Sequence, residues 1–201
     1  MQEQDDSPLL DQIAAGDATA VPALLRRYRD RLRRMVQYRL DPRVTARVDA
    51  SDVVQEALLA ATGAIHEYAQ QRPVAFYPWL RRIAWERMID MQRQHLDAQR
   101  RSVLREVQPP SSFSNASLCE LARHLTWGGP TPSHDLRKQE ANVRLARALD
   151  QLDPGQREVV LLRYLEQLSL ADTAAVLNIT ADAVKMRQLR AMRRLREILE
   201  H

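Results

Sequence analysis

The sequence predicts an all-α protein made of two small helical domains joined by a flexible linker. The chain of 201 residues has only 5 Gly and 2 Phe and is rich in Ala, Leu, Arg and Glu, a composition that favours helix. Apolar residues recur at three- and four-residue steps through most of the chain. The stretch QPPSSFSNAS, which starts at Gln108, interrupts this pattern with residues typical of turns and linkers.

The first domain, residues 1–97, is expected to hold four helices. Each has an apolar repeat bounded by residues that cap or stop a helix. The expected elements are a short helix at 9–14, a helix at 21–40 with Pro22 near its start and Asp41-Pro42 after its end, a helix capped by Asp49 or Ser51, a loop at 71–78 marked by Pro73 and Pro78, and a helix from Trp79 to about His95.

The linker is expected at 98–135 and the second domain at 136–201. In the second domain, Ser169 can cap a short helix that ends near Leu177. Asn178 follows where a tight turn needs a left-handed residue, and Thr180 can cap the long helix after it. A short helix, a tight turn and a long helix together predict a helix-turn-helix. Two further helices are expected before it, around 143–149 and 159–165, separated by Asp153-Pro154-Gly155.

The composition narrows the class of protein. With 45% apolar and 28% charged residues the chain is an ordinary globular protein, and its single Cys excludes an internal disulfide framework. The acidic start, MQEQDDSPLL, is unlike a signal peptide, and no apolar run reaches membrane length. We therefore expect a cytoplasmic protein without membrane insertion. The net charge of +4 is modest, and the excess of Arg over Lys fits either nucleic-acid contacts or a GC-rich genome.

No arrangement of residues predicts catalysis. The sequence has no glycine-rich phosphate loop and no nucleophile motif, and its five His are scattered. Cys119, His124 and His134 are the one conceivable metal cluster, but their spacing does not match a metal site. We therefore expect no enzyme activity, no metal and no cofactor.

The expected last helix, from Thr180 to Glu200, carries a basic face opposite an apolar one. Val184, Ala191 and Leu195 fall on one arc, and the basic residues lie around the rest. A solvated basic face is one interpretation. Met186 and Leu189 lie inside the basic arc, which favours a helix that enters the major groove of DNA. Gln188 falls on the apolar arc, where the sequence gives it no role.

Three stretches together resemble bacterial RNA polymerase sigma factors of the extracytoplasmic-function group. The segment around DVVQEALLAA is similar to the opening helices of sigma region 2, and WLRRIAWERMIDMQR is similar to its later part. LDQLDPGQREVVLLRYLEQLSLADTAAVLNITADAVKMRQLRAMRRLRE resembles region 4 over nearly its whole length. The order and spacing of the three stretches are more specific than any one of them.

For region 2 the resemblance implies two contacts. Asp52, Gln55 and Glu56 share a helix face that in the family docks on the clamp helices of the polymerase large subunit. Without the resemblance, a solvated acidic face is the favoured interpretation; with it, polymerase docking is favoured. The resemblance also implies that the helix at 79–93 contacts the −10 promoter element. Planar side chains can stack on the unpaired bases of opened DNA, and cationic side chains can bind its backbone. The residues concerned are Arg81, Arg82, Trp85, Arg87 and Arg93.

The same helix raises two further expectations. Trp79 is expected in the core, whereas the aromatic residues of the preceding segment, Tyr68, Phe76 and Tyr77, lie where the family captures a flipped base. Glu86 departs from the family, which often has Asn there, and an unpaired acid beside DNA is unfavourable.

For region 4 the resemblance implies contact with the −35 promoter element. The residues concerned are Thr180, Lys185, Met186, Leu189 and Arg190, with Arg193 and Arg194 on the phosphates. Two residues depart from the family: Asn178 replaces the usual turn Gly, and Thr173 stands where an apolar residue is common. Asn tolerates the left-handed conformation, so we expect the turn to form.

The resulting hypothesis is a promoter-specificity subunit that binds core RNA polymerase, recognises the −35 and −10 elements and helps to open DNA. Members of the family are often held inactive by an anti-sigma factor, so such a partner is also expected. One alternative is a stand-alone helix-turn-helix regulator, which leaves residues 49–93 without a role. Another is a protein-binding adaptor, which leaves the basic helix unexplained.

Overall fold

The computed structural model describes residues 5–40, 48–100, 121 and 135–200, and every regular element in these ranges is helical. Its contacts divide the chain into two compact units, Met1–Arg105 and Glu106–His201. The expected linker at 98–135 stays a prediction, because most of it lies outside the described residues, including Cys119, His124 and His134. Leu121, within it, is helical and fully buried.

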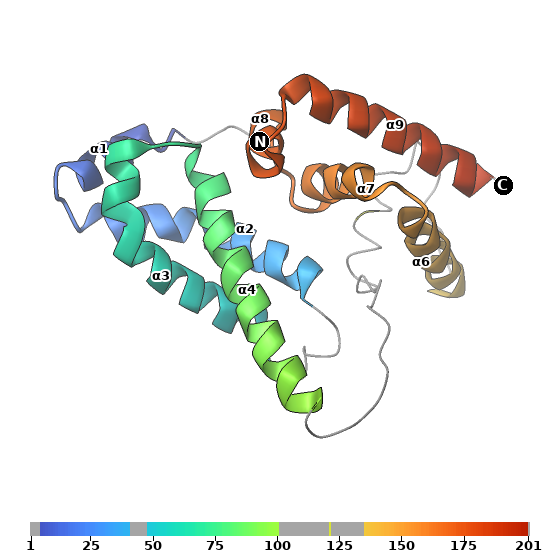
Figure 1. Ribbon diagram of the computed structural model, residues 1–201, viewed down its shortest axis with the longest axis horizontal. Coiled ribbons are helices and arrows are strands. Elements are labelled where there is room, and N and C mark those ends of the chain that lie inside the picture. Colours follow the sequence, from blue (N-terminus) through green and yellow to red (C-terminus); the bar gives the residue numbers. More distant parts are fainter. Residues whose placement is uncertain (1–4, 41–47, 101–120, 122–134, 201) are drawn as a thin grey trace. The chain divides into compact units, whose positions relative to one another are not determined.

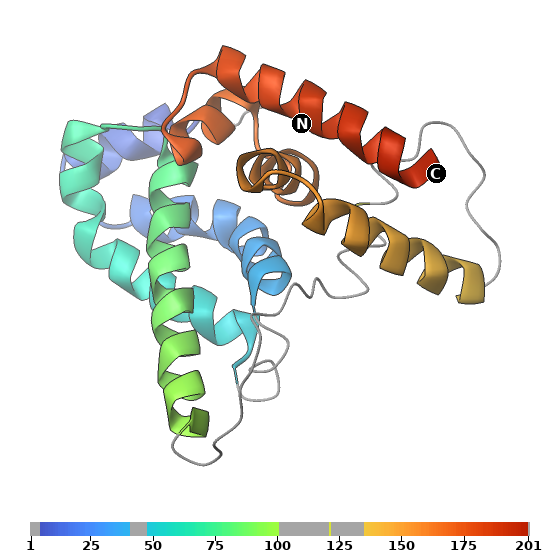
Figure 2. The ribbon, with the colours of Figure 1, turned by 45° about the vertical axis from the view of Figure 1, so that its right-hand side comes forward.

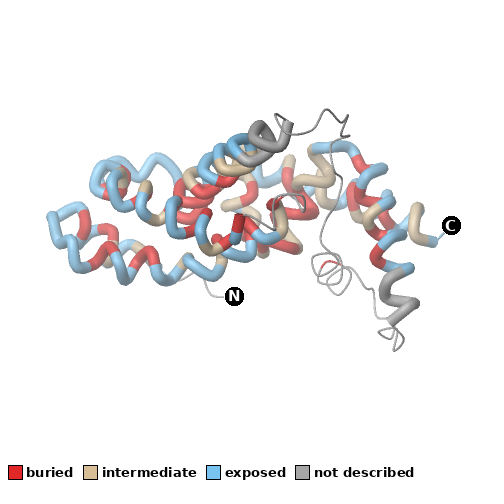
Figure 3. The backbone as a smooth tube through the Cα atoms, turned by 90° about the horizontal axis from the view of Figure 1, so that it is seen from below, coloured by how far each residue is buried: buried red, intermediate tan, exposed pale blue. Residues whose placement is uncertain are grey.

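The described residues of the first unit form a bundle of four helices (Figure 1). They are α1 (Ser7–Ala14), α2 (Ala20–Arg39), α3 (Ala50–Gln71) and α4 (Phe76–Arg100). Helix α3 packs against each of the other three, and α2 also packs against α1 and α4. The buried residues form a continuous inner side on each helix, with exposed residues on the outside (Figure 3). This arrangement confirms the helical periodicity expected from the sequence.

Helix α3 begins and ends at identifiable caps. Of the two expected caps, Asp49 is the one used: its carboxylate accepts a hydrogen bond from the backbone N–H of Ser51 at 2.7 Å. That hydrogen bond lowers the pKa of Asp49 below its ordinary value. At the other end Arg72 takes a left-handed conformation, with φ of 42°, and its guanidinium pairs with Asp11 of α1 at 2.5 Å.

Helix α4 begins three residues earlier than the sequence suggested. Phe76, Tyr77 and Pro78 form its first turn instead of a loop, and the helix continues past His95 to Arg100. Proline is compatible with a first turn because the N–H groups there have no acceptor within the helix, so its missing donor costs nothing. The expectation that residues 76–78 belong to a loop was therefore wrong.

The aromatic residues expected to capture a flipped base form the core instead. Tyr68 stacks on Trp79 with ring centroids 4.4 Å apart, and Tyr28 packs against Phe76 and Tyr77 at 5.3 and 5.7 Å. Tyr68 is 4% exposed and donates its hydroxyl to the Val74 carbonyl at 2.7 Å. Burial raises the pKa of Tyr68 to about 12. Because these rings are packed together, they have no free face for a base, whereas the core position expected for Trp79 is confirmed.

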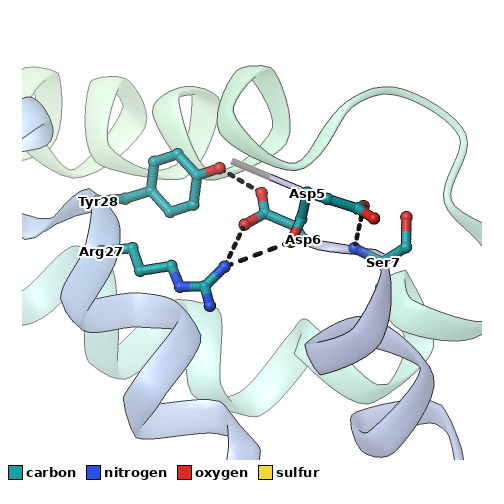
Figure 4. A network of polar contacts seen from close by, with 5 residues as sticks. All are labelled: Asp5, Asp6, Ser7, Arg27 and Tyr28. Carbon is teal, nitrogen blue, oxygen red and sulfur yellow. Dashed lines mark hydrogen bonds and ion pairs between the residues drawn. The ribbon is translucent and has the colours of Figure 1, made fainter. Parts of the chain in front are cut away.

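A polar network attaches the start of α1 to α2 (Figure 4). The Asp6 carboxylate accepts hydrogen bonds from the Tyr28 hydroxyl and from Arg27 Nη1, the latter at 3.3 Å. Asp5 accepts from the backbone N–H of Ser7 at 2.9 Å, and hydrogen bonding from the side chain and then the backbone of Ser7 lowers the pKa of Asp5. The acidic residues of this segment therefore hold the first helix in the bundle.

The second unit consists of α6 (Asp135–Asp150), α7 (Pro154–Val160), the π-helical turn η1 (Leu161–Leu165), α8 (Leu170–Leu177) and α9 (Ala181–Glu200). Helix α9 packs against α6, α7 and α8 (Figure 2). Asp153 caps α7 by accepting from the backbone N–H of Gly155 at 2.9 Å. The π-turn was not expected: the Glu166 N–H donates to the Leu161 carbonyl at 3.0 Å, five residues back.

The helix-turn-helix is formed as the sequence predicts. Ser169 caps α8 by accepting from the Asp172 N–H at 3.0 Å, and Asn178 takes the left-handed conformation with φ of 51°. Thr180 accepts from the Ala183 N–H at 3.2 Å and caps α9. The unusual Thr173 is fully buried, and its hydroxyl donates to the Ser169 carbonyl at 2.8 Å. Its polar group is therefore satisfied within α8.

Candidate functional sites

The outer side of α9 carries an apolar and cationic stripe, which we call the α9 stripe. Its members are Met186, Leu189, Arg190 and Arg193: the adjacent Leu189 and Arg190 lie one turn after Met186, and Arg193 lies one turn after them. Met186 and Leu189 are 47% and 54% exposed, whereas Val184 on the opposite side is fully buried. The helix therefore uses one side for packing and presents two large apolar side chains to solvent among arginines.

The cations around the α9 stripe differ in their partners. Lys185 Nζ lies 3.3 Å from Asp182, and Arg194 Nη1 lies 3.2 Å from Glu197. Both pairs are exposed, so each contributes at most about 1 kcal/mol and separates easily. Within the described residues, no carboxylate pairs with Arg190 or Arg193. These two guanidinium groups are available to an anionic partner.

Gln188, which had no role in the sequence, joins α9 to the π-turn. Its side-chain amide donates to the Tyr164 hydroxyl at 2.9 Å, and both residues are half-buried. Beside it Arg187 covers the start of α7, where its Nη1 lies 3.1 Å from the position of a Cβ on Gly155. The hydrogen bond therefore links α9 to η1, which packs against α7 and α8.

Replacing Tyr164 with phenylalanine should lower the free energy of unfolding by about 0.5–1.5 kcal/mol, because the ring stays and only the hydroxyl acceptor is lost. Urea unfolding of the full chain, followed by circular dichroism, measures this change. Gln188→Leu and the double variant complete the cycle. Since both single variants remove the same hydrogen bond, their effects should not add; full additivity would contradict the coupling.

On α4 the predicted DNA-contacting residues do not all share a face. Arg82, Trp85 and Arg93 lie along one side, where both arginines are exposed and Trp85 is half-buried. Glu86 lies on this side too, 4.0 Å from the Arg82 guanidinium, so the acid that departs from the family has a cation beside it. Arg87 is exposed on a different side, 3.9 Å from Asp90.

Arg81 is buried, so the prediction that it contacts DNA is wrong. It is only 6% exposed, because it falls on the same arc of α4 as the buried Ala84 and Met88. Its guanidinium carbon lies 5.6 Å from the centre of the Trp85 ring, and that of Arg39 lies 5.4 Å from the same ring. Both distances are within the range of cation–π attraction, so Arg81 supports Trp85 from inside the bundle.

The acidic face of α3 is exposed as expected. Asp52, Gln55 and Glu56 all lie on the outer side of the helix, while Val53 and Val54 face the core. Sequence reasoning missed Leu59, one turn further along the same side and 75% exposed, although its spacing from Glu56 was a sufficient signal. The face therefore combines carboxylates with a large apolar side chain.

The described ranges lack two further kinds of feature. No helix there is long and apolar enough to cross a membrane. No group of three or more His, Cys, Asp or Glu is arranged to hold a metal ion in the same ranges.

Two protein families match the chain, one in each unit. Residues 24–97 match Sigma-70 region 2, and residues 148–197 match Sigma-70 region 4. The first match contains the acidic face of α3 and the exposed side of α4, and the second contains the α9 stripe.

Full-length relatives are similar over nearly the whole chain. RNA polymerase sigma factor CnrH of Cupriavidus metallidurans is 30% identical over 198 residues, covering 98% of this chain and 96% of the relative. The ECF RNA polymerase sigma-E factor of Haemophilus influenzae is 28% identical, covering 100% and 97%. The solved structure of CnrH in complex with the cytosolic domain of CnrY has a TM-score of 0.56 at 25% identity, with 98% of each chain covered.

Proposed function

The chain belongs to the extracytoplasmic-function group of the sigma-70 family of RNA polymerase sigma factors, and we propose that its exposed helix faces divide the work of promoter use. It is a promoter-specificity subunit that binds core RNA polymerase, recognises the −35 and −10 elements and helps to open DNA. The polymerase supplies the chemistry, so the chain itself need not be an enzyme. Because the polymerase and the promoter are in the cytoplasm, we place its action there.

The α9 stripe is the observation that supports DNA reading most strongly. Met186 and Leu189 are exposed at the spacing at which a recognition helix meets thymine methyl groups. Arg190, without a carboxylate partner among the described residues, is suited to a guanine edge, and Arg193 to a phosphate. Lys185 and Arg194 would exchange their weak ion pairs for contacts with DNA phosphates. Thr180, at the start of the helix, is proposed to contact the same DNA element.

The exposed side of α4 is proposed to contact the −10 element. Trp85 offers a half-buried ring held by two guanidinium groups, and Arg82 and Arg93 lie on either side of it along the helix. A planar ring between cations suits an unstacked base and its backbone. Arg87 lies on another side of the helix, so it would act on a separate stretch of phosphate, and Arg81 acts through Trp85.

The acidic face of α3 is proposed to bind core polymerase. Asp52 and Glu56 are exposed, and among the described residues no cation pairs with either. Gln55 adds an amide donor and acceptor beside them. An acidic surface of this kind favours association with a basic surface on the partner.

A protein inhibitor is a further proposed partner. CnrH, which is similar over nearly its full length, was solved in complex with the cytosolic domain of CnrY. We infer that an anti-sigma factor also regulates this chain by covering the faces that bind polymerase or DNA.

Reconstitution with core RNA polymerase on a library of promoter sequences tests the proposal. Initiation should depend on the chain and should select two DNA elements separated by a fixed spacing. A stand-alone regulator would bind DNA without polymerase, and an adaptor would bind polymerase without sequence selection. Absence of both core binding and sequence-selective initiation would overturn the proposal.

A further inference from the structure

Met186 differs from the other described methionines in its exposure to solvent. Five of the six methionines of the chain lie in the described ranges. Met35 and Met88 are buried, at 0% and 1% exposure, and Met91 and Met192 are half-buried, whereas Met186 is 47% exposed. Met186 is therefore the described methionine that is most accessible to a small reagent in solution.

An apolar contact to DNA does not by itself require methionine at this position. Leu189, one turn later in the α9 stripe, is 54% exposed and offers an apolar side chain of similar volume. The methionine differs in its thioether sulfur, which is polarisable and can be oxidised to a sulfoxide. Met186 therefore adds to the α9 stripe a reactive group that contact with a thymine methyl group does not use.

Resting on the proposed function, we propose that Met186 is a reversible oxidation site through which a peroxide weakens promoter recognition. The thioether sulfur donates an electron pair to one oxygen of hydrogen peroxide, so that an S–O bond forms and the O–O bond breaks. The other oxygen leaves as hydroxide and takes the proton of the new S–OH group. The sulfur is oxidised, the peroxide is reduced, and the products are methionine sulfoxide and one water.

Oxidation of Met186 would act on two of the proposed DNA contacts. The sulfoxide is polar, and a thymine methyl group offers its oxygen no hydrogen-bond donor, so burying it there is unfavourable. Arg190 lies one turn after Met186, and no carboxylate among the described residues pairs with it. Its guanidinium would therefore be free to donate to the sulfoxide oxygen, at the expense of its contact with a guanine edge.

Treating the chain with hydrogen peroxide before core RNA polymerase is added tests this site. Peptide mapping by mass spectrometry should show that Met186 gains an oxygen atom faster than the buried and half-buried methionines. Once the peroxide has been removed, the holoenzyme made with the oxidised chain should bind the promoter selected from the library about tenfold more weakly. Core binding should not change, and methionine sulfoxide reductases A and B should restore promoter binding.

Met186→Leu and Met192→Leu form a matched pair, each compared with its own untreated form. Met186→Leu removes the proposed site, so peroxide should not weaken its binding to the promoter. Met192→Leu removes a half-buried methionine of the same helix, so it should stay as sensitive to peroxide as the native chain. Cys119 is present in all three chains, so oxidation of its thiol cannot produce a difference between them.

Met186→Gln separates this inference from the proposed function, because it places a polar group of similar length on the α9 stripe without any oxidant. It should weaken promoter binding. If it does so, but peroxide fails to oxidise Met186 first or weakens the native and Met186→Leu chains equally, the oxidation site is refuted and the DNA contact stands. If Met186→Gln binds the promoter as tightly as the native chain, the proposed contact at Met186 fails, and the inference fails with it.

Discussion

Replacing Glu56 with arginine should weaken binding of the chain to core RNA polymerase by about 30-fold or more. The change removes one side of an attractive charge pair and places a like charge against the basic partner, which together cost about 2 kcal/mol or more. The fold should be unaffected, since Glu56 is exposed and has no partner among the described residues. Competition between labelled native chain and variant for core polymerase measures the loss.

Asp30→Arg is the control for this prediction. Asp30 is an exposed acid of the same unit but belongs to α2, so its reversal changes the net charge equally without touching the proposed surface. It should reduce affinity only slightly and mainly at low salt. Equal losses for the two variants would mean that total charge, and not the α3 face, controls the association.

Local signals in the sequence predicted most of the fold. Ser169, Asn178 and Thr180 act through bonds to residues no more than a few positions away, so their roles could be read from residue type and spacing. The π-turn could not be predicted in this way, because one extra residue in a helical turn leaves the apolar pattern almost unchanged. Pro78 was wrongly assigned to a loop, because proline occurs both in loops that end helices and in the first turn of a helix.

The exposure of the candidate site residues was predicted correctly at positions where helical periodicity alone determines it. Val184 and Leu195 are buried and Met186 is exposed, as their positions around α9 indicated. The aromatic residues near the start of α4 were misjudged because their partner, Tyr28, is distant in sequence. Arg81 was misjudged because a long arginine side chain can pack its methylene groups in a bundle, so residue type alone does not indicate exposure.

The role of Gln188 shows what tertiary structure adds to the recognition helix. On the helical wheel it is a polar residue on an apolar arc, but in the fold its amide bonds to Tyr164 of the π-turn at 2.9 Å. This hydrogen bond joins α9 to η1, while Met186 and Leu189 of the same helix are exposed. We therefore expect the proposed base readout by Met186 and Leu189 to depend also on Gln188 and Tyr164, which are not proposed to touch DNA.

Arg190→Ala should weaken specific binding of the holoenzyme to its promoter by about 5- to 150-fold, because a bidentate contact to a base edge is worth about 1–3 kcal/mol. Binding to core polymerase should not change, since Arg190 lies in the other unit from the acidic face. The measurement compares the promoter selected from the library with a version whose upstream element is altered, both with the same assembled holoenzyme.

Arg193→Ala is the informative partner of this variant, because the two arginines lie one turn apart on α9 and both are exposed. A phosphate contact carries no sequence information, so Arg193→Ala should weaken the native and altered promoters equally and reduce the salt dependence by about one ion. Arg190→Ala should instead reduce the difference between the two promoters. If both variants lose affinity equally on both DNAs, Arg190 holds phosphate only, and base readout would rest on Met186 and Leu189.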